Sequence, residues 1–149
     1  MIVYVKWLDD KRDYVILKND DNTFKSGTLD HLLKTNAEIQ DWLANNGINF
    51  IDLSMDNDSA TATAVNYAIA KRQRDFDVTQ ITVTTAAGNT FQGNEDAQTR
   101  MARAVTGLNP TETIQWKMAD NTMLTITREE LKEALVLAGR AQETIWATV

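Results

Sequence analysis

The chain contains no cysteine and a single histidine in its 149 residues. Without cysteine it can form no disulfide, no thiol nucleophile and no cysteine-based zinc site, and one histidine excludes a multi-histidine metal site. No apolar run approaches the roughly 20 residues that a membrane helix requires, so we expect no membrane partner. The segment from Met1 to Trp7 lacks the basic and long apolar regions of a signal peptide, so we expect the chain to stay in a cytoplasm or to be packed into a particle assembled there.

Positive charge is also scarce. Fifteen Lys and Arg against 21 Asp and Glu leave a net charge of −6. Proteins that bind nucleic acid rely on Lys and Arg to neutralise phosphates, so this balance disfavours a nucleic-acid partner. The basic stretch Lys71 to Arg74 is short, and we place it at the end of a helix, where cations suit the helix dipole. Neither the Gly-x-x-x-x-Gly-Lys-Ser/Thr loop nor the Gly-x-Gly-x-x-Gly motif is present, so we expect no nucleotide cofactor.

The candidate catalytic and metal-binding residues have simpler interpretations. Asp20-Asp21-Asn22 and Asp56-Asn57-Asp58 offer oxygen ligands, but neither has the spacing of an EF-hand loop, so we interpret both as turns and predict no metal. His31 lies beside Asp30, but no serine elbow is present, which favours a structural or exposed histidine. We therefore predict no catalytic residue, and a hydrolase that uses loop carboxylates is the weakest hypothesis.

Residues 1–58 are predicted to form an N-terminal unit with the order β-β-(β)-α-β. Apolar and β-branched residues predict strands over 2–8 and 14–17, a short third strand over 23–25, and a last strand over 50–53. One or two helical turns fit residues 28–34. A longer helix is expected to begin with Thr35 as N-cap in a capping box with Glu38, and to end at Gly47.

Residues 59–149 are predicted to follow the order α-β-β-α-β-β-α. A helix over 59–74 should bury a stripe of Val65, Ala68, Ile69 and Arg72. Hairpins are expected over 81–92 and 114–126, with Asn94 capping the helix between them. Thr127 and Glu130 have the spacing of a capping box that opens the last helix. The turns within these hairpins are short, which predicts an α+β fold of antiparallel hairpins packed against helices.

The boundary between the two units is placed at the polar segment Asp56 to Ser59. Charge distribution changes there: residues 1–58 carry a net charge of −5, and residues 59–149 carry −1. Tryptophans occur in both parts. Trp7 and Trp42 follow the apolar patterns of their elements and are expected in the core, and Trp116 lies on the inward face of its hairpin. Trp146 either packs back on that hairpin or belongs to a contact surface.

The part from about Val65 to the end resembles a known domain. The likeness begins with a helix that ends in a basic cluster (68–75), a strand with an aromatic residue (90–96) and a helix with an early Arg or Gln (98–101). It continues with a Trp-x-x-Ala-Asp-Asn hairpin (116–121) and a terminal helix (129–146). This pattern is similar to a small domain of unknown biochemical function seen in phage tail-fibre and tail-associated proteins. The segment 109–113 is shorter than in the common form, and residues 1–58 lie outside the likeness.

The resemblance implies a non-enzymatic structural protein of a phage tail, attached to other tail or tail-fibre proteins in several symmetric copies. It would be located in the virion, and in the host cytoplasm during assembly. The alternative is a tail-fibre assembly chaperone that is absent from the mature particle. The side chains that we expect at the contact surface are Trp116, Leu124 and Trp146.

Overall fold

The computed structural model describes residues 1–51 and 58–149. Its contacts divide the chain into two compact parts, an N-terminal unit, Met1–Gln73, and a C-terminal unit, Arg74–Val149. This division falls inside helix α3, Ser59–Thr79, whereas the sequence places the boundary at the first residue of that helix. No helix among the described residues has both the length and the apolar character needed to cross a membrane.

The N-terminal unit is built on one sheet. The strands are β1 (Ile2–Trp7), β2 (Tyr14–Asn19), β3 (Phe24–Thr28) and β4 (Asn49–Phe50), in the order β3-β2-β1-β4. The two predicted hairpin pairings are antiparallel, while β4 pairs with β1 in parallel. The strand predicted over 50–53 begins one residue earlier, and its positions 52 and 53 lie outside the described residues.

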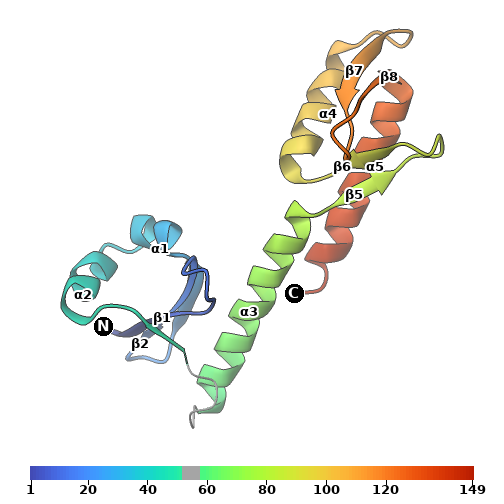
Figure 1. Ribbon diagram of the computed structural model, residues 1–149. Coiled ribbons are helices and arrows are strands. Elements are labelled where there is room, and N and C mark those ends of the chain that lie inside the picture. The colour runs from blue at the N-terminus through green and yellow to red at the C-terminus, as the bar shows by residue number, and fades with distance from the viewer. Residues whose placement is uncertain (52–57) are drawn as a thin grey trace. The chain divides into compact units, whose positions relative to one another are not determined.

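Helices cover both faces of this sheet because the side chains of β2 alternate. Helices α1 (Leu29–Thr35) and α2 (Glu38–Asn46) lie beside β1 and β2 (Figure 1). Val15 and Leu17 pack with Leu32 and Ile39 on that face. On the opposite face, Ile16 packs with Val65 and Ala68 of α3.

The predicted capping box at Thr35 is wrong. Thr35 is the last residue of α1, where its hydroxyl donates to the carbonyl of His31 at 3.0 Å. The cap of α2 is Ala37, and Asn36 instead accepts from the backbone N–H of Glu38 at 3.2 Å. Thr35 cannot serve as the N-cap because the preceding turn already uses its backbone and hydroxyl.

Helix α3 is longer than predicted, since it continues five residues past Arg74 to Thr79. The basic stretch therefore lies inside the helix, and its explanation as a helix end is wrong. The buried stripe also differs, because Val65 and Ala68 are buried but Ile69 is 40% exposed. Arg72 is held by ion pairs to Asp9 at 3.2 Å and Asp13 at 2.9 Å.

The C-terminal unit has the predicted order of helices and hairpins. After α3 come β5 (Thr82–Thr84), β6 (Thr90–Gln92), α4 (Glu95–Gly107), β7 (Thr113–Lys117), β8 (Met123–Thr127) and α5 (Arg128–Trp146). Each hairpin is an antiparallel pair, and α4 packs along α5 beside them (Figure 1). The fold is therefore α+β. Both hairpins and both helices contribute to one buried core: Phe91, Ala97, Met101, Met118, Ile126, Leu131 and Ala134.

A close approach at Gly93 joins β6 to α5 and to the residue before β5. A Cβ at this position would lie 2.6 Å from Ile81 Cγ2 and 3.1 Å from Ala138 Cβ. The backbone N–H of Gly93 donates to the carbonyl of Ile81 at 2.8 Å. Only glycine leaves space for this contact, so the position fixes how tightly the hairpin sits against α5.

The helix caps in this unit were well predicted. Asn94 accepts from the N–H of Ala97 at 2.9 Å, and Thr127 accepts from the N–H of Glu130 at 3.2 Å. The capping box predicted from Thr127 and Glu130 is thus confirmed only in its N-cap half, because the carboxylate of Glu130 accepts from the loop between β5 and β6.

Candidate interaction surface

The three predicted contact residues lie in the C-terminal unit and differ in exposure. Leu124 is 39% exposed and Trp146 is 47% exposed, while Trp116 is half-buried. Trp116 packs against the core through the inward face of its hairpin, as predicted. The side chain of Trp116 thus has a structural role as well as an accessible surface.

Trp116 and Leu124 are direct cross-strand partners of the β7–β8 hairpin. Opposite residues of an antiparallel pair share one face, so the indole and the leucine side chain project on the same side. Each also lines a hollow of its own. Trp116 lines one with Ala97 and Arg100, and Leu124 lines another with Asn89 and Thr90.

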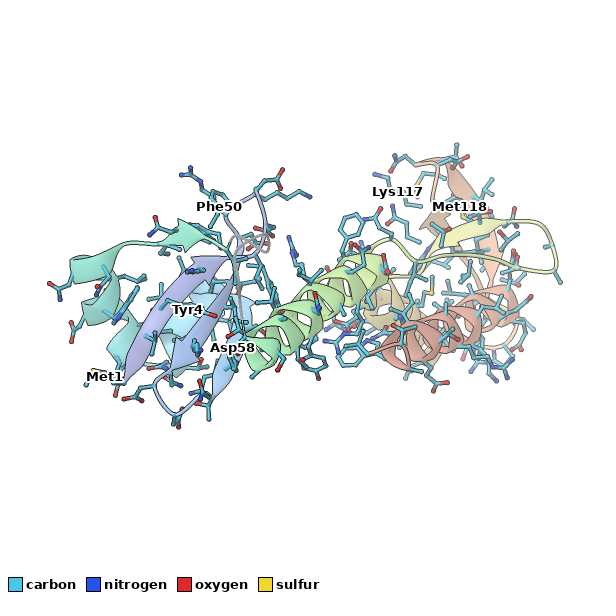
Figure 2. The ribbon with its side chains drawn as sticks, turned by 90° about the horizontal axis from the view of Figure 1, so that it is seen from below. Met1, Tyr4, Phe50, Asp58, Lys117 and Met118 are labelled. Carbon is cyan, nitrogen blue, oxygen red and sulfur yellow. The ribbon has the colours of Figure 1, made fainter. Side chains whose placement is uncertain are left out.

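The stretch from Trp116 to Asn121 forms the end of β7 and the turn into β8; Lys117 and Met118 are labelled in Figure 2. Met118 is buried in the core. Asp120 accepts from the backbone N–H of Thr122 at 3.0 Å and from its hydroxyl at 2.6 Å, and these bonds lower the pKa of Asp120. Asn121 has φ 68°, which asparagine adopts more readily than most residues. Turn formation therefore accounts for Asp120, Asn121 and Thr122.

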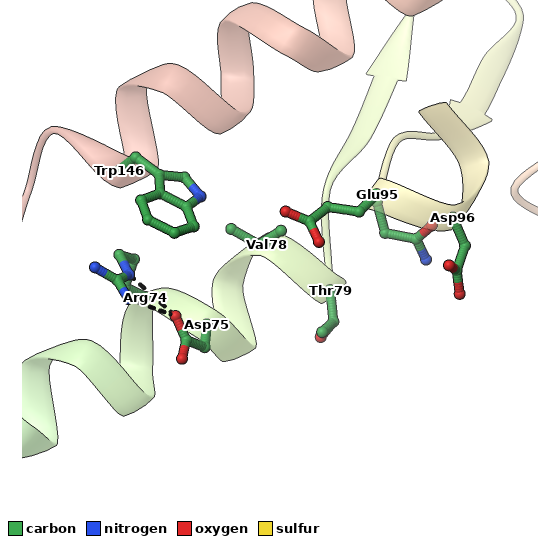
Figure 3. A pocket seen from close by; sticks show the side chains of 8 residues that line it. Arg74, Asp75, Val78, Thr79, Glu95, Asp96 and Trp146 are labelled. Atoms are coloured by element: carbon green, nitrogen blue, oxygen red, sulfur yellow. Dashed lines mark hydrogen bonds and ion pairs between the residues drawn. The ribbon is translucent and has the colours of Figure 1, made fainter. Parts of the chain in front are cut away.

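Trp146 lies in a different place, against α3 (Figure 3). The guanidinium carbon of Arg74 lies 4.2 Å from the centroid of the indole ring, a cation–π contact. Arg74 is in turn held by Asp75, with Nη2 at 2.9 Å from Oδ1. The ring contact thus ties the end of α5 to α3, whereas the hairpin that we considered as a packing partner lines other hollows.

A hollow of about 440 Å³ lies beside this ring. Val78 and Thr79 of α3 line it together with the first residues of α4, including Glu95 and Asp96 (Figure 3). The Glu95 carboxylate accepts from the side-chain amide of Gln142 at 2.7 Å, so one of its oxygens is oriented by α5. An aromatic wall on one side and carboxylates on the other give this hollow a mixed apolar and acidic character.

Sequence reasoning missed a carboxylate clamp on the β5–β6 loop. Oε1 of Glu130 accepts from the hydroxyl of Thr85 and from the side-chain amide of Asn89, each at 2.8 Å. Glu133, one turn further along α5, accepts from the backbone N–H of Ala86 at 2.8 Å. The spacing of Thr127 and Glu130 predicted a cap, and nothing in the local sequence indicates a partner more than 40 residues away.

The loop carboxylates considered as catalytic or metal-binding groups are engaged in local structure. Asp20 pairs with the N-terminal ammonium group at 2.8 Å. Asp21 accepts from the hydroxyl of Thr23 at 2.6 Å and from its N–H at 3.0 Å, which lowers the pKa of Asp21. Asp56 and Asn57 lie outside the described residues, and over the described ranges no three His, Asp or Glu side chains are grouped to hold a metal. His31 is exposed on α1.

Comparison with known proteins identifies the second part of the chain. The model of a protein family, described as Domain of unknown function (DUF4376), matches residues 59–147. No curated protein and no solved structure matches the chain. The match begins at the first residue of α3 and contains both hairpins, α4 and all of α5. Because it spans more than half of the sequence, the chain belongs to this family of domains of unknown function.

Proposed function

We propose that the chain is a non-enzymatic structural protein of a phage tail, and that its C-terminal unit attaches it to another tail or tail-fibre protein. The observation that carries the proposal is the exposure of large apolar side chains beside hollows of this unit. Leu124 and Trp146 are 39% and 47% exposed, and each lines a hollow. An exposed tryptophan beside a hollow is typical of the side chains that dominate protein contacts.

Charge and size support a protein partner. Residues 59–149 have a net charge of only −1, so no large field repels or selects a partner over this part of the chain. A contact of standard size needs roughly 800 Å² on each side, which one hairpin and one helix can provide. The resemblance of the Trp116 to Asn121 hairpin to phage tail-associated domains supplies the class of partner. Attachment within a virion implies several copies in symmetric positions.

The test is the presence of the protein in purified phage particles, measured by quantitative mass spectrometry. Wild-type protein should be present in a fixed ratio to other tail proteins. A double variant, Leu124→Ala with Trp146→Ala, should be absent from particles, because it removes both exposed apolar side chains. Its melting temperature should fall only slightly, because neither side chain belongs to the buried core and the Trp146 contact with Arg74 that it loses is partly exposed.

Val136→Ala is the matched control, because Val136 is 44% exposed on α5 and lines none of the hollows described above. This variant should enter particles as wild type does. If wild-type protein binds the tail-fibre protein in infected cells but is absent from finished particles, it is an assembly chaperone instead. If the double variant is incorporated normally, the contact lies elsewhere and the assignment to the C-terminal unit is wrong.

A further inference from the structure

One side of the N-terminal unit has an open sheet edge. Strand β3 is the outermost strand of the described sheet, with β2 on its inner side. At the two ends of this pair, Asn19 N–H donates to the carbonyl of Thr23 at 2.9 Å, and Leu29 N–H donates to that of Asp13 at 3.1 Å. Hydrogen-bonded pairs alternate along an antiparallel ladder, and the register between these ends is regular.

That alternation determines which backbone groups of β3 are unused. Lys25 and Gly27 are at the hydrogen-bonded positions, so their N–H and C=O groups point to β2. Phe24 and Ser26 are at the alternate positions, so theirs point away from the sheet. No other strand of the described sheet lies on this side of β3. The edge thus offers two donors and two acceptors to a further strand.

A groove of about 450 Å³ follows this edge. One wall comes from α1, through His31 and Leu32, and the other comes from α3, through Tyr67 and Lys71. These helices cover opposite faces of the sheet, so a groove lined by both must pass across the edge strand between them. The bottom of the groove is formed by the β3 edge and by Ile16, whose side chain is fully buried.

The charge in this groove is opposite to that of the surrounding unit. Residues 1–73 carry 11 Asp and Glu against 8 Lys and Arg, a net charge of −3. The ionisable side chains that line the groove are nevertheless Lys25, Lys71, His31 and Tyr67, with neither Asp nor Glu among them. Lys25 forms no ion pair with any described carboxylate. The Nζ of Lys71 lies 4.7 Å from the centroid of the Tyr67 ring, which holds the ammonium group at the α3 wall.

We propose that the groove at the β3 edge binds an extended acidic segment of a partner protein, which adds to the sheet as a further strand. The backbone groups of Phe24 and Ser26 supply the ladder hydrogen bonds, and alternate side chains of the segment reach the apolar bottom of the groove and the lysines. A second copy of β3 fits less well, because it would bring another Lys25 to a groove that already holds two lysines. The inference goes beyond the proposed function, since β3 and α1 lie outside the family match.

The probe is a fluorescein-labelled decapeptide of alternating glutamate and valine, and its counterpart has lysine in place of glutamate. Fluorescence polarisation with the full chain should give at least tenfold tighter binding of the acidic peptide. Hydrogen exchange measured by NMR should show new protection at the N–H groups of Phe24 and Ser26. Equal binding of the two peptides, or no detectable binding of the acidic peptide at millimolar protein, would overturn the proposal.

Two variants test the ladder and the charge separately. Ser26→Pro removes an N–H that points away from β2, so it should abolish binding, while Ser26→Thr keeps the N–H and should bind as wild type does. Lys25→Glu should weaken binding at least tenfold, and Lys132→Glu, the same charge change on exposed α5, should change it less than twofold. Binding that survives both Ser26→Pro and Lys25→Glu would place the peptide elsewhere and overturn the proposal. Self-association of the wild type that Ser26→Pro abolishes in sedimentation would assign the edge to a second copy and also overturn it.

Discussion

The short strands of the two units are stabilised in different ways. In the N-terminal unit, four strands share one hydrogen-bonded sheet, which helices cover on both faces. In the C-terminal unit, the described strands form two separate pairs, β5–β6 and β7–β8. An isolated two-stranded hairpin is at best marginally stable in water, so these pairs depend on the helices beside them.

Side-chain contacts from the helices supply that support. Phe91 of β6 and Ile126 of β8 are buried in the core that α4 and α5 complete. Glu130 and Glu133 of α5 hold the loop of the first hairpin. We therefore expect the four-stranded sheet to depend less on its helix contacts than the two hairpins do, since the hairpins lose their structure when those contacts are removed.

The largest expected effect is that of Phe91→Ala. Phe91 is fully buried in the C-terminal core, so the variant should lower the free energy of unfolding of that unit by about 3–5 kcal/mol. Denaturant unfolding followed by hydrogen exchange should show the loss in the C-terminal unit, with the β1–β2–β3 ladder unchanged. Phe50→Ala is the control, because Phe50 is 48% exposed. Equal losses in both units would mean that the C-terminal core also stabilises the N-terminal sheet.

Gly93→Ala should have the next largest effect, about 1–3 kcal/mol of destabilisation, because the added Cβ overlaps the Ile81 side chain. Gly139→Ala is a matched change on α5 where a Cβ meets nothing within 4 Å. It should stabilise the helix by up to about 1 kcal/mol. Thermal unfolding of the two variants measures the difference. Similar melting temperatures would mean that the hairpin can move away from α5 at little cost.

Glu130→Ala tests the carboxylate clamp. It leaves the buried Thr85 hydroxyl and the Asn89 amide without their shared acceptor, so we expect a loss of about 1–2 kcal/mol. Amide exchange should increase over the β5–β6 loop more than elsewhere. Lys132→Ala, two residues away and exposed, serves as the control and should have little effect. An unchanged loop in Glu130→Ala would show that packing alone holds the first hairpin.

The smallest expected effect, about 1 kcal/mol, concerns acid stability of the N-terminal unit. Burial acts to raise the pKa of Asp9, but hydrogen bonds from the N–H groups of Asp13 and Tyr14 and from Arg72 outweigh it, so the pKa is lowered. A lowered folded-state pKa gives stability that is present above the unfolded value, about pH 4, and lost as pH falls through the folded value. Asp9→Asn should reduce that acid dependence, measured as the melting temperature between pH 7 and pH 2. An equal acid dependence in the variant would assign it to other carboxylates.

The sequence patterns predicted most of the elements, because strands and helix caps depend on residues close together in the chain. Alternation gave the hairpins, and the caps at Asn94 and Thr127 follow from side chains that reach only three residues. The errors occurred where one residue has two possible partners, as with Thr35, or where a helix continues past a basic cluster, as at Arg74. The inward face of Trp116 was predicted by alternation, but its pairing with Leu124 follows from the register of β7 and β8, and the position of Trp146 against Arg74 depends on tertiary packing.

The parallel pairing of β4 with β1 bears on the order of folding. In the C-terminal unit, the described strands pair only within the hairpins β5–β6 and β7–β8, so each pairing closes a short loop at a small entropy cost. In the N-terminal unit, Lys6 must meet Asn49, and Ile16 must meet Val65, across most of the unit. Refolding kinetics should therefore have two phases, with the C-terminal hairpins protected from exchange before β4 joins its sheet.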